Sequence, residues 1–112
     1  MSLRMPSARR AAFAAEWQAA ADARAAGDLA RAFRHLERAH IIGQRWTIPH
    51  VRSHLGMLAI GWSRRDRREV LGQLARIVAA ALFSRVWVPE GNTGGADVPA
   101  MRRMEVPRDL RL

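Results

Sequence analysis

The chain has 112 residues, of which 49% are apolar, so it is long enough to fold as one compact domain with a modest core and too short for two. It contains no cysteine, which excludes disulfides, thiolate zinc sites and cysteine nucleophiles and leaves His, Asp, Glu and Met as potential metal ligands. The net charge of +9, carried by arginine without any lysine, suggests an acidic partner, although a GC-rich coding sequence would produce the same bias.

The start of the chain, residues 1–17, has arginines ahead of an alanine-rich run, as a leader peptide does. Glu16 interrupts that run, and no small-residue cleavage site follows an unbroken apolar region. The longest uncharged apolar run, residues 77–83, is far short of the roughly 20 residues that a membrane helix needs. We therefore expect an unprocessed, soluble, cytoplasmic protein with no membrane partner.

Two helices are predicted in the first 43 residues. Ser7 is a favourable N-cap for a helix over residues 8–26, and Gly27 is expected to end it. Asp28 is expected to cap a second helix, residues 29–42, in which apolar side chains recur at spacings of three and four. Because the connecting segment is short, these helices should form an antiparallel hairpin.

A second hairpin is predicted after Gly43, which ends the second helix. Thr47 is expected to cap a third helix that runs to about Ser63, with Pro49 in its first turn, where the missing N–H does no harm. Asp66 is expected to cap a fourth helix, residues 68–83, whose inward positions are predicted to be Val70, Leu74, Ile77, Val78 and Ala81.

The two hairpins show a weak internal repeat, because residues 27–39 align with residues 65–77. The first segment resembles the helical hairpin of tetratricopeptide repeats in the spacing of Gly27, Ala32, Leu36 and Ala39, but it lacks the usual Trp and Tyr. We therefore predict an all-α fold: a four-helix domain over residues 1–85, either tetratricopeptide-like or a small bundle.

The remaining residues, 86–112, are predicted to form an extended, turn-rich C-terminal tail packed on the helices. Residues 89–99 are dense in turn formers and cannot be helical, while Met101, Met104 and Val106 are available to press the tail against the helices. The glycine-rich stretch GNTGG lacks the Gly-Lys-Ser/Thr ending of a phosphate-binding loop. We interpret it as a turn that lets the tail fold back.

All four histidines lie within residues 35–54. On the second helix, His40 falls on the apolar stripe with Glu37 one turn before it, whereas His35 falls among the arginines and is expected at the surface. On the third helix, His50 and His54 are four residues apart and share a face, and Met57 continues the same line.

In an antiparallel hairpin with a short connection, His40 lies level with His50, and Glu37 lies level with His54. The pattern predicts one transition-metal site with five candidate ligands: Glu37, His40, His50, His54 and Met57. Neutral imidazoles suit zinc and copper, the carboxylate broadens the choice toward iron, and the thioether favours Cu(I). We expect copper or zinc, with iron less favoured.

Ordinary packing is the alternative for each of these residues. A histidine on an apolar stripe is commonly a hydrogen-bonded core residue, Glu37 has His40 within reach as a partner, and Met57 suits a core. The few hydroxyl side chains form no recognisable Ser-His-Asp arrangement, and nothing in the sequence positions a substrate, so it does not indicate an enzyme.

Three strings, HLERAHIIGQ at 35–44, HVRSHLGML at 50–58 and VWVPEGNTGGADV at 86–98, together resemble a bacterial family of domains of unknown function, the one numbered 3703. The resemblance covers most of residues 10–109. It implies a small bacterial protein and no particular activity.

The function predicted from the sequence is binding of a transition metal, in bacterial metal handling or sensing. The alternative is a helical interaction module that binds an acidic protein or a nucleic acid through its arginines, among them those of residues 64–68 beside Trp62. A homo-oligomer is compatible with either function.

Overall fold

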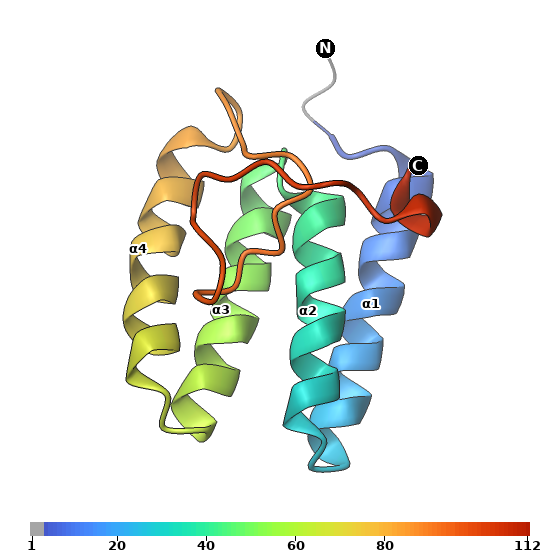
Figure 1. The fold of residues 1–112 in the computed structure, drawn as a ribbon. Coiled ribbons are helices and arrows are strands. Elements are labelled where there is room, and N and C mark those ends of the chain that lie inside the picture. Colours follow the sequence, from blue (N-terminus) through green and yellow to red (C-terminus); the bar gives the residue numbers. More distant parts are fainter. Residues whose placement is uncertain (1–3) are drawn as a thin grey trace.

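Four α-helices follow one another along the chain, and a turn-rich tail completes it (Figure 1). The structure is a computed structural model that describes residues 4–112, so residues 1–3 of the predicted four-helix region lie outside the described residues. The helices are α1 (Ser7–Ala25), α2 (Leu29–Gly43), α3 (Thr47–Ser63) and α4 (Arg67–Phe83), and the tail carries one 3-10 turn, η1 (Arg108–Leu110). The described residues contain no β-strand, and the predicted all-α fold is confirmed.

Side-chain caps begin two of the helices. The carboxylate of Asp28 accepts a hydrogen bond from the backbone of Arg31, and Asp66 accepts one from the backbone of Glu69, so both predicted caps are confirmed. Gly27 follows α1 with a φ of 79°, a conformation that a residue without a Cβ adopts readily.

The caps predicted at Ser7 and Thr47 are wrong by one position. Each is the first helical residue, and the N-caps are Pro6 and Trp46, neither of which makes a side-chain capping bond. Proline has a preset φ, and the tight loop after Gly43 already directs the chain into α3, so these two helices begin without a capping side chain.

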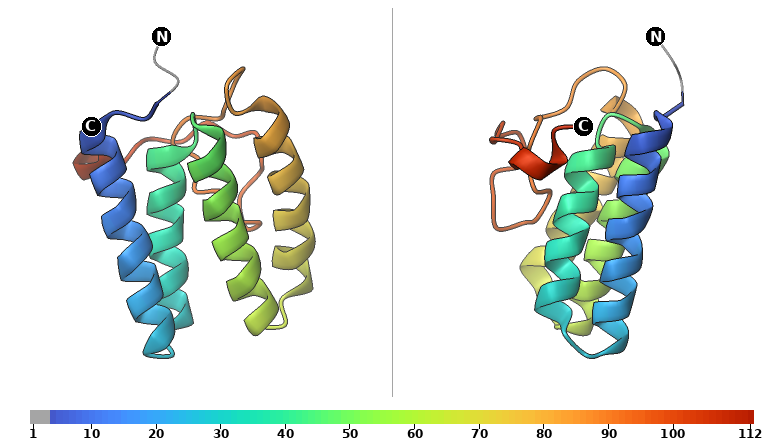
Figure 2. Two further views of the ribbon diagram at one scale, coloured as in Figure 1. Left: turned by 180° about the vertical axis from the view of Figure 1, so that it is seen from behind. Right: turned by 90° about the vertical axis from the view of Figure 1, so that its right-hand side faces the viewer.

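The helices lie in a row, each antiparallel to the next, with α1 and α4 at the two ends (Figures 1 and 2). The tail runs across one face of this row. Two apolar clusters hold the α1–α2–α3 part together. One comprises Met5, Phe13, Ala39, Ile41, Ile42 and Leu110. The other comprises Ala20, Ala23, Ala32, Leu36, Met57 and Ile60.

The prediction of which residues of α4 point inward is largely wrong. The structure buries Glu69, Gln73 and Ala80. Of the predicted positions, Leu74, Val78 and Ala81 are exposed, whereas Val70 and Ile77 are half-buried. The helix turns its polar side chains inward because the tail and α3 supply hydrogen-bond partners for them, and a satisfied polar group costs little to bury.

The first part of the tail lies between α2 and α4. A methyl group added at Gly94 would approach the His40 ring on α2 to within 2.7 Å, and one added at Gly72 on α4 would approach Ala96 to within 2.8 Å. The tail therefore packs closely against both helices. None of the helices in residues 4–112 combines the length and the apolar character needed to cross a membrane.

Candidate metal centre

Three histidines from two helices converge at one buried point. His40 comes from α2, and His50 and His54 come from α3. The Nε2 atom of His50 lies 3.0 Å from Nε2 of His40 and 3.1 Å from Nε2 of His54. The ring centroids form a nearly equilateral triangle with sides of 4.6 to 4.9 Å.

The local sequence explains this convergence. The spacing of four residues places His50 and His54 one above the other on α3. Only three residues separate α2 from α3, so the last turn of α2, which carries His40, faces the first turns of α3. The predicted alignment of these histidines across the hairpin is confirmed. All three rings are nearly inaccessible to solvent, with exposed fractions of 2%, 7% and 2%.

Each imidazole has an acceptor on its other nitrogen. His40 Nδ1 lies 2.8 Å from the carbonyl oxygen of Asn92, which can only accept a hydrogen bond. His50 Nδ1 lies 2.8 Å from Oγ of Ser84, and that hydroxyl donates its single proton to the carbonyl of Ala80. Nδ1 must therefore be the protonated nitrogen in both rings.

The third acceptor is the amide oxygen of Gln73, 2.6 Å from His54 Nδ1. The amide nitrogen of Gln73 lies 2.7 Å from a carboxylate oxygen of Glu69 and 2.9 Å from the carbonyl of Gly94, both of which can only accept. This environment fixes the orientation of the amide, so its oxygen faces His54. Nδ1 of His54 is thus also a donor.

The three rings are held neutral. Burial, and then the neighbouring histidines, keep the pKa of His40 well below its usual range. Burial lowers the pKa of His50 to about 3, with His54 adding to the effect, and burial lowers the pKa of His54 to about 4. At neutral pH each ring has one proton, and that proton is on Nδ1.

It follows that three unprotonated Nε2 atoms face one another. Lone pairs 3.0 and 3.1 Å apart with no proton between them repel, and a cation bound to all three removes the repulsion. With Zn–N distances of 2.0–2.1 Å and tetrahedral angles, two ligand nitrogens lie roughly 3.3 Å apart. The candidate ligand atoms of the three rings lie within 4.8 Å of one another, close to this spacing.

The outer hydrogen bonds match those of metal-bound histidines. A metal-ligating imidazole donates its remaining N–H to a carbonyl, carboxylate or water, which fixes the tautomer and the ring orientation. Asn92, Ser84 and Gln73 provide three such acceptors. Among the described residues, His40, His50 and His54 form the one group of His, Asp and Glu side chains close enough to hold a metal ion, with ligand atoms within 4.8 Å of one another.

Glu37 and Met57 lie outside this group. Burial, and then the charge of Asp97 in the tail, raise the pKa of Glu37 to about 7. The sulfur of Met57 accepts a hydrogen bond from the amide nitrogen of Gln73. The structure thus gives both residues contacts away from the three Nε2 atoms, and their roles as ligands stay predictions.

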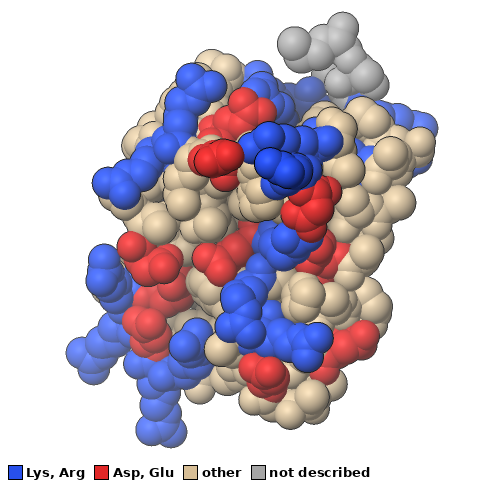
Figure 3. Space-filling model, turned by 45° about the vertical axis from the view of Figure 1, so that its right-hand side comes forward, with Lys and Arg blue, Asp and Glu red and all other residues tan. Residues whose placement is uncertain are grey.

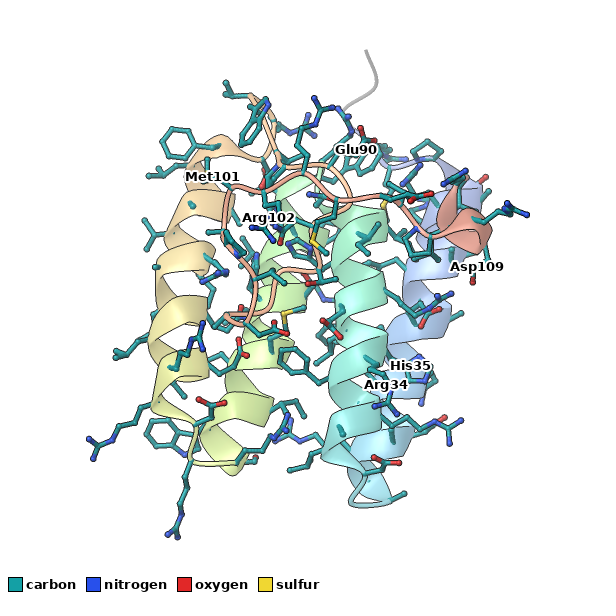
Figure 4. All side chains as sticks on the ribbon, in the orientation of Figure 1. Arg34, His35, Glu90, Met101, Arg102 and Asp109 are labelled. Atoms are coloured by element: carbon teal, nitrogen blue, oxygen red, sulfur yellow. The ribbon has the colours of Figure 1, made fainter. Side chains whose placement is uncertain are left out.

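The remaining histidine, His35, lies on another side of α2. It is half-buried, and its Nδ1 lies 2.7 Å from a carboxylate oxygen of Glu16 on α1. Figure 4 shows it on the side of α2 that faces α1.

A cavity of about 290 Å³ adjoins the centre. The three histidines form part of its wall, together with Arg76 of α4. Most of the remaining wall is apolar and comes from the end of α4 and the tail: Ala79, Ala80, Phe83, Val86, Trp87, Val88, Pro89, Ala100 and Met101. Met101 lies beside the C-terminal end of α4 (Figure 4), at an exposed position of this wall.

Sequence reasoning missed the residues that orient the histidines. Ser84, Gln73 and Asn92 follow their histidine partners by 34, 19 and 52 residues, so no local periodicity connects them. The stretch GNTGG contains two glycines with positive φ, Gly91 and Gly94, and a turn bond joins Val98 N–H to the carbonyl of Gly95 at its end. The stretch also has a second role, because Gly94 has a φ of 86° and packs against the His40 ring where no Cβ fits.

A family model matches nearly the whole chain. The model of a family described as "Protein of unknown function (DUF3703)" matches residues 7–112. No curated protein and no solved structure matches the chain.

Proposed function

Because the chain belongs to the DUF3703 family, whose description leaves the activity open, we propose a function from the metal centre itself: the protein binds one transition-metal ion, zinc or copper, through Nε2 of His40, His50 and His54. The observation that supports this proposal is the meeting of three unprotonated nitrogens at 3.0 and 3.1 Å, each ring fixed by an acceptor on Nδ1. A role in metal handling or sensing follows from such a site.

The donor set favours zinc or copper over iron. Three neutral imidazoles are suitable ligands for Zn²⁺ and for both oxidation states of copper. No carboxylate belongs to the group in the described part of the chain, whereas the iron sites of oxygenases and di-iron bundles use one or more. With three protein ligands, a four-coordinate ion keeps one position for water or another small ligand.

The test is metal titration of protein purified without an affinity tag. The wild-type chain should bind one equivalent of Zn²⁺ or Cu⁺, and the double variant His50→Ala, His54→Ala should lose it. His35→Ala is the matched control, because that histidine lies outside the group and should leave the stoichiometry at one. Equal metal binding by the wild-type and the double variant would refute the proposal.

A second candidate is binding of an acidic protein or a nucleic acid. Four exposed arginines lie where α3 passes into α4, Arg64 and Arg65 in the connection and Arg67 and Arg68 in the first turn of α4. Trp62, at the end of α3, is beside them with 74% of its surface exposed. An exposed indole among arginines suits base stacking and phosphate contacts. On the face shown in Figure 3, acidic side chains lie among the basic ones. This face therefore does not form a broad basic surface. Such binding should weaken steeply with salt and be unaffected by His50→Ala, His54→Ala.

A further inference from the structure

The cavity beside the three histidines has two features that the metal centre alone does not require. Its wall is mostly apolar, and its one charged side chain is Arg76. A volume of about 290 Å³ is at the small end of the range for pockets that bind small molecules, and it is far too small for a peptide.

Arg76 forms no ion pair with a carboxylate of residues 4–112. Its Nη1 donates to the carbonyl of Gly72 at 3.1 Å, and its Nη2 donates to the carbonyl of Val98 at 3.0 Å. Its Nε is buried and has no hydrogen-bond partner among the described residues. The guanidinium therefore has a donor without a partner and no paired carboxylate, a combination that an anion would satisfy.

The same guanidinium is close to the histidines. Its charge contributes to the lowered pKa values of His40 and His54, after the larger effect of burial. A divalent ion on three neutral imidazoles would add two further positive charges at this end of the cavity. The polar end of the cavity therefore attracts anions, whereas the rest of the wall, with Phe83, Trp87 and Met101, suits an apolar group.

We propose that this cavity binds a small carboxylic acid with an apolar body, whose carboxylate takes the fourth position on the metal and faces Arg76. This inference rests on the proposed metal centre, since the carboxylate needs the ion. The apolar part of the ligand lies against the side chains of α4 and the tail. Binding requires both the carboxylate and the apolar body. An acid without an apolar body, or an uncharged analogue, should therefore bind more weakly.

The experiment uses the full chain loaded with one equivalent of Co²⁺, which reports its own coordination in the visible spectrum, and repeats the titrations calorimetrically with Zn²⁺. The probes are benzoate, acetate as the acid without an apolar body, and benzamide as the uncharged analogue. Benzoate should change the cobalt spectrum and bind at least about tenfold more tightly than either of the others.

Two variants locate the carboxylate. Arg76→Gln keeps a hydrogen-bonding side chain but removes the charge, and it should weaken benzoate binding about tenfold or more while still binding one metal ion. Arg68→Gln is the control, because Arg68 is an exposed arginine in the first turn of the same helix and should change nothing. Comparing the three probes on the wild-type chain tests the proposal independently of how Arg76→Gln folds.

The outcomes separate the two proposals. A chain that binds one metal ion but not benzoate, or that binds benzoate no better than acetate, overturns the ligand proposal and leaves the metal centre intact. Unchanged benzoate binding in Arg76→Gln also overturns it. A wild-type chain that binds no metal ion overturns both.

Discussion

Helix α2 carries two histidines five residues apart that have opposite surroundings. His35 faces α1, where Glu16 contacts it with one carboxylate oxygen and contacts Arg38 with the other, both at 2.7 Å. Arg38 in turn pairs with Asp109 of the C-terminal turn. His40 is buried against α3 and the tail, and its ring touches two other imidazoles and a backbone carbonyl.

The difference shows how the surroundings determine what a histidine can do. His35 joins Glu16 and Arg38 in a half-buried network. Ion pairs near the surface, such as that of Glu16 with Arg38, contribute roughly 0–1 kcal/mol to stability. The three buried histidines have neutral acceptors on Nδ1 and no carboxylate on Nε2, so their free nitrogens are available to a cation. One helix thus carries a histidine paired with a carboxylate on one face and a proposed metal ligand on another.

The largest expected effect is on zinc affinity, and it should distinguish the buried histidines from His35. His40→Ala leaves two imidazoles and should weaken zinc binding by about a thousandfold or more, whereas His35→Ala should leave it within about twofold. Competition with a chromophoric zinc chelator measures both. Similar losses in the two variants would mean that the histidines act through the fold and not as ligands.

The pH dependence of the metal-free protein should follow from the buried rings. The pKa of His50 is about 3 and that of His54 about 4 when folded, against about 6.5 when unfolded, so unfolding takes up protons below pH 6.5. Their contribution to stability is full above pH 6.5 and is lost as the pH falls toward 4. The free energy of unfolding should decrease by about 1.4 kcal/mol per pH unit for each such ring.

Glu37 contributes with the opposite sign, because its pKa is raised to about 7 when folded. Its carboxyl destabilises the fold as the pH rises from about 4.5 to 7. Urea unfolding of Glu37→Gln at several pH values therefore isolates the histidines, and the acid destabilisation should be steeper in this variant than in the wild type over that range. A stability that does not change between pH 6.5 and 4 would show that the rings are not held neutral.

Changing an acceptor should have a smaller effect than removing a ligand. Ser84→Ala takes away the partner of His50 Nδ1 and should weaken zinc binding about 10- to 100-fold, the usual effect of losing an outer hydrogen bond. Ser63→Ala, at the exposed end of α3, is the matched control. Identical zinc affinities in these two variants would mean that Ser84 does not orient the ring.

The smallest effect is expected at the α1–α2 network. Glu16→Gln removes the charge that pairs with His35 and Arg38, and it should lower the free energy of unfolding by about 1 kcal/mol or less. Zinc affinity should not change. Thermal unfolding with and without one equivalent of zinc measures both quantities, and a weaker response to zinc in this variant would connect the network to the metal centre.

The sequence predicted the features that depend on local spacing. The caps at Asp28 and Asp66 and the pairing of His40 with His50 and His54 follow from helical periodicity and short connections. The orientation of α4 could not be predicted in this way, because Glu69 and Gln73 are polar and appear solvent-facing until the tail supplies their partners. Helical periodicity alone predicts that the apolar residues Leu74 and Val78 are buried. Both are exposed, because α4 is the last helix of the row and no further helix of residues 4–112 covers this face.

The acceptors of the metal centre depend on contacts distant in sequence. Asn92 orients His40 only because residues 91–96 lie between α2 and α4, and its own side-chain amide donates to the carbonyls of Pro99 and Arg102. A single sequence does not reveal such a loop packing. Composition alone indicated turns at this place, and the close approach of Gly94 to His40 required the tertiary structure.

The coordination of zinc in the loaded protein is the most direct test of the metal centre. X-ray absorption at the zinc edge of the wild-type chain with one equivalent bound should show three imidazole nitrogens at about 2.0–2.1 Å and one further light atom. A shell of oxygen ligands, or one with fewer than two imidazoles, would contradict the account.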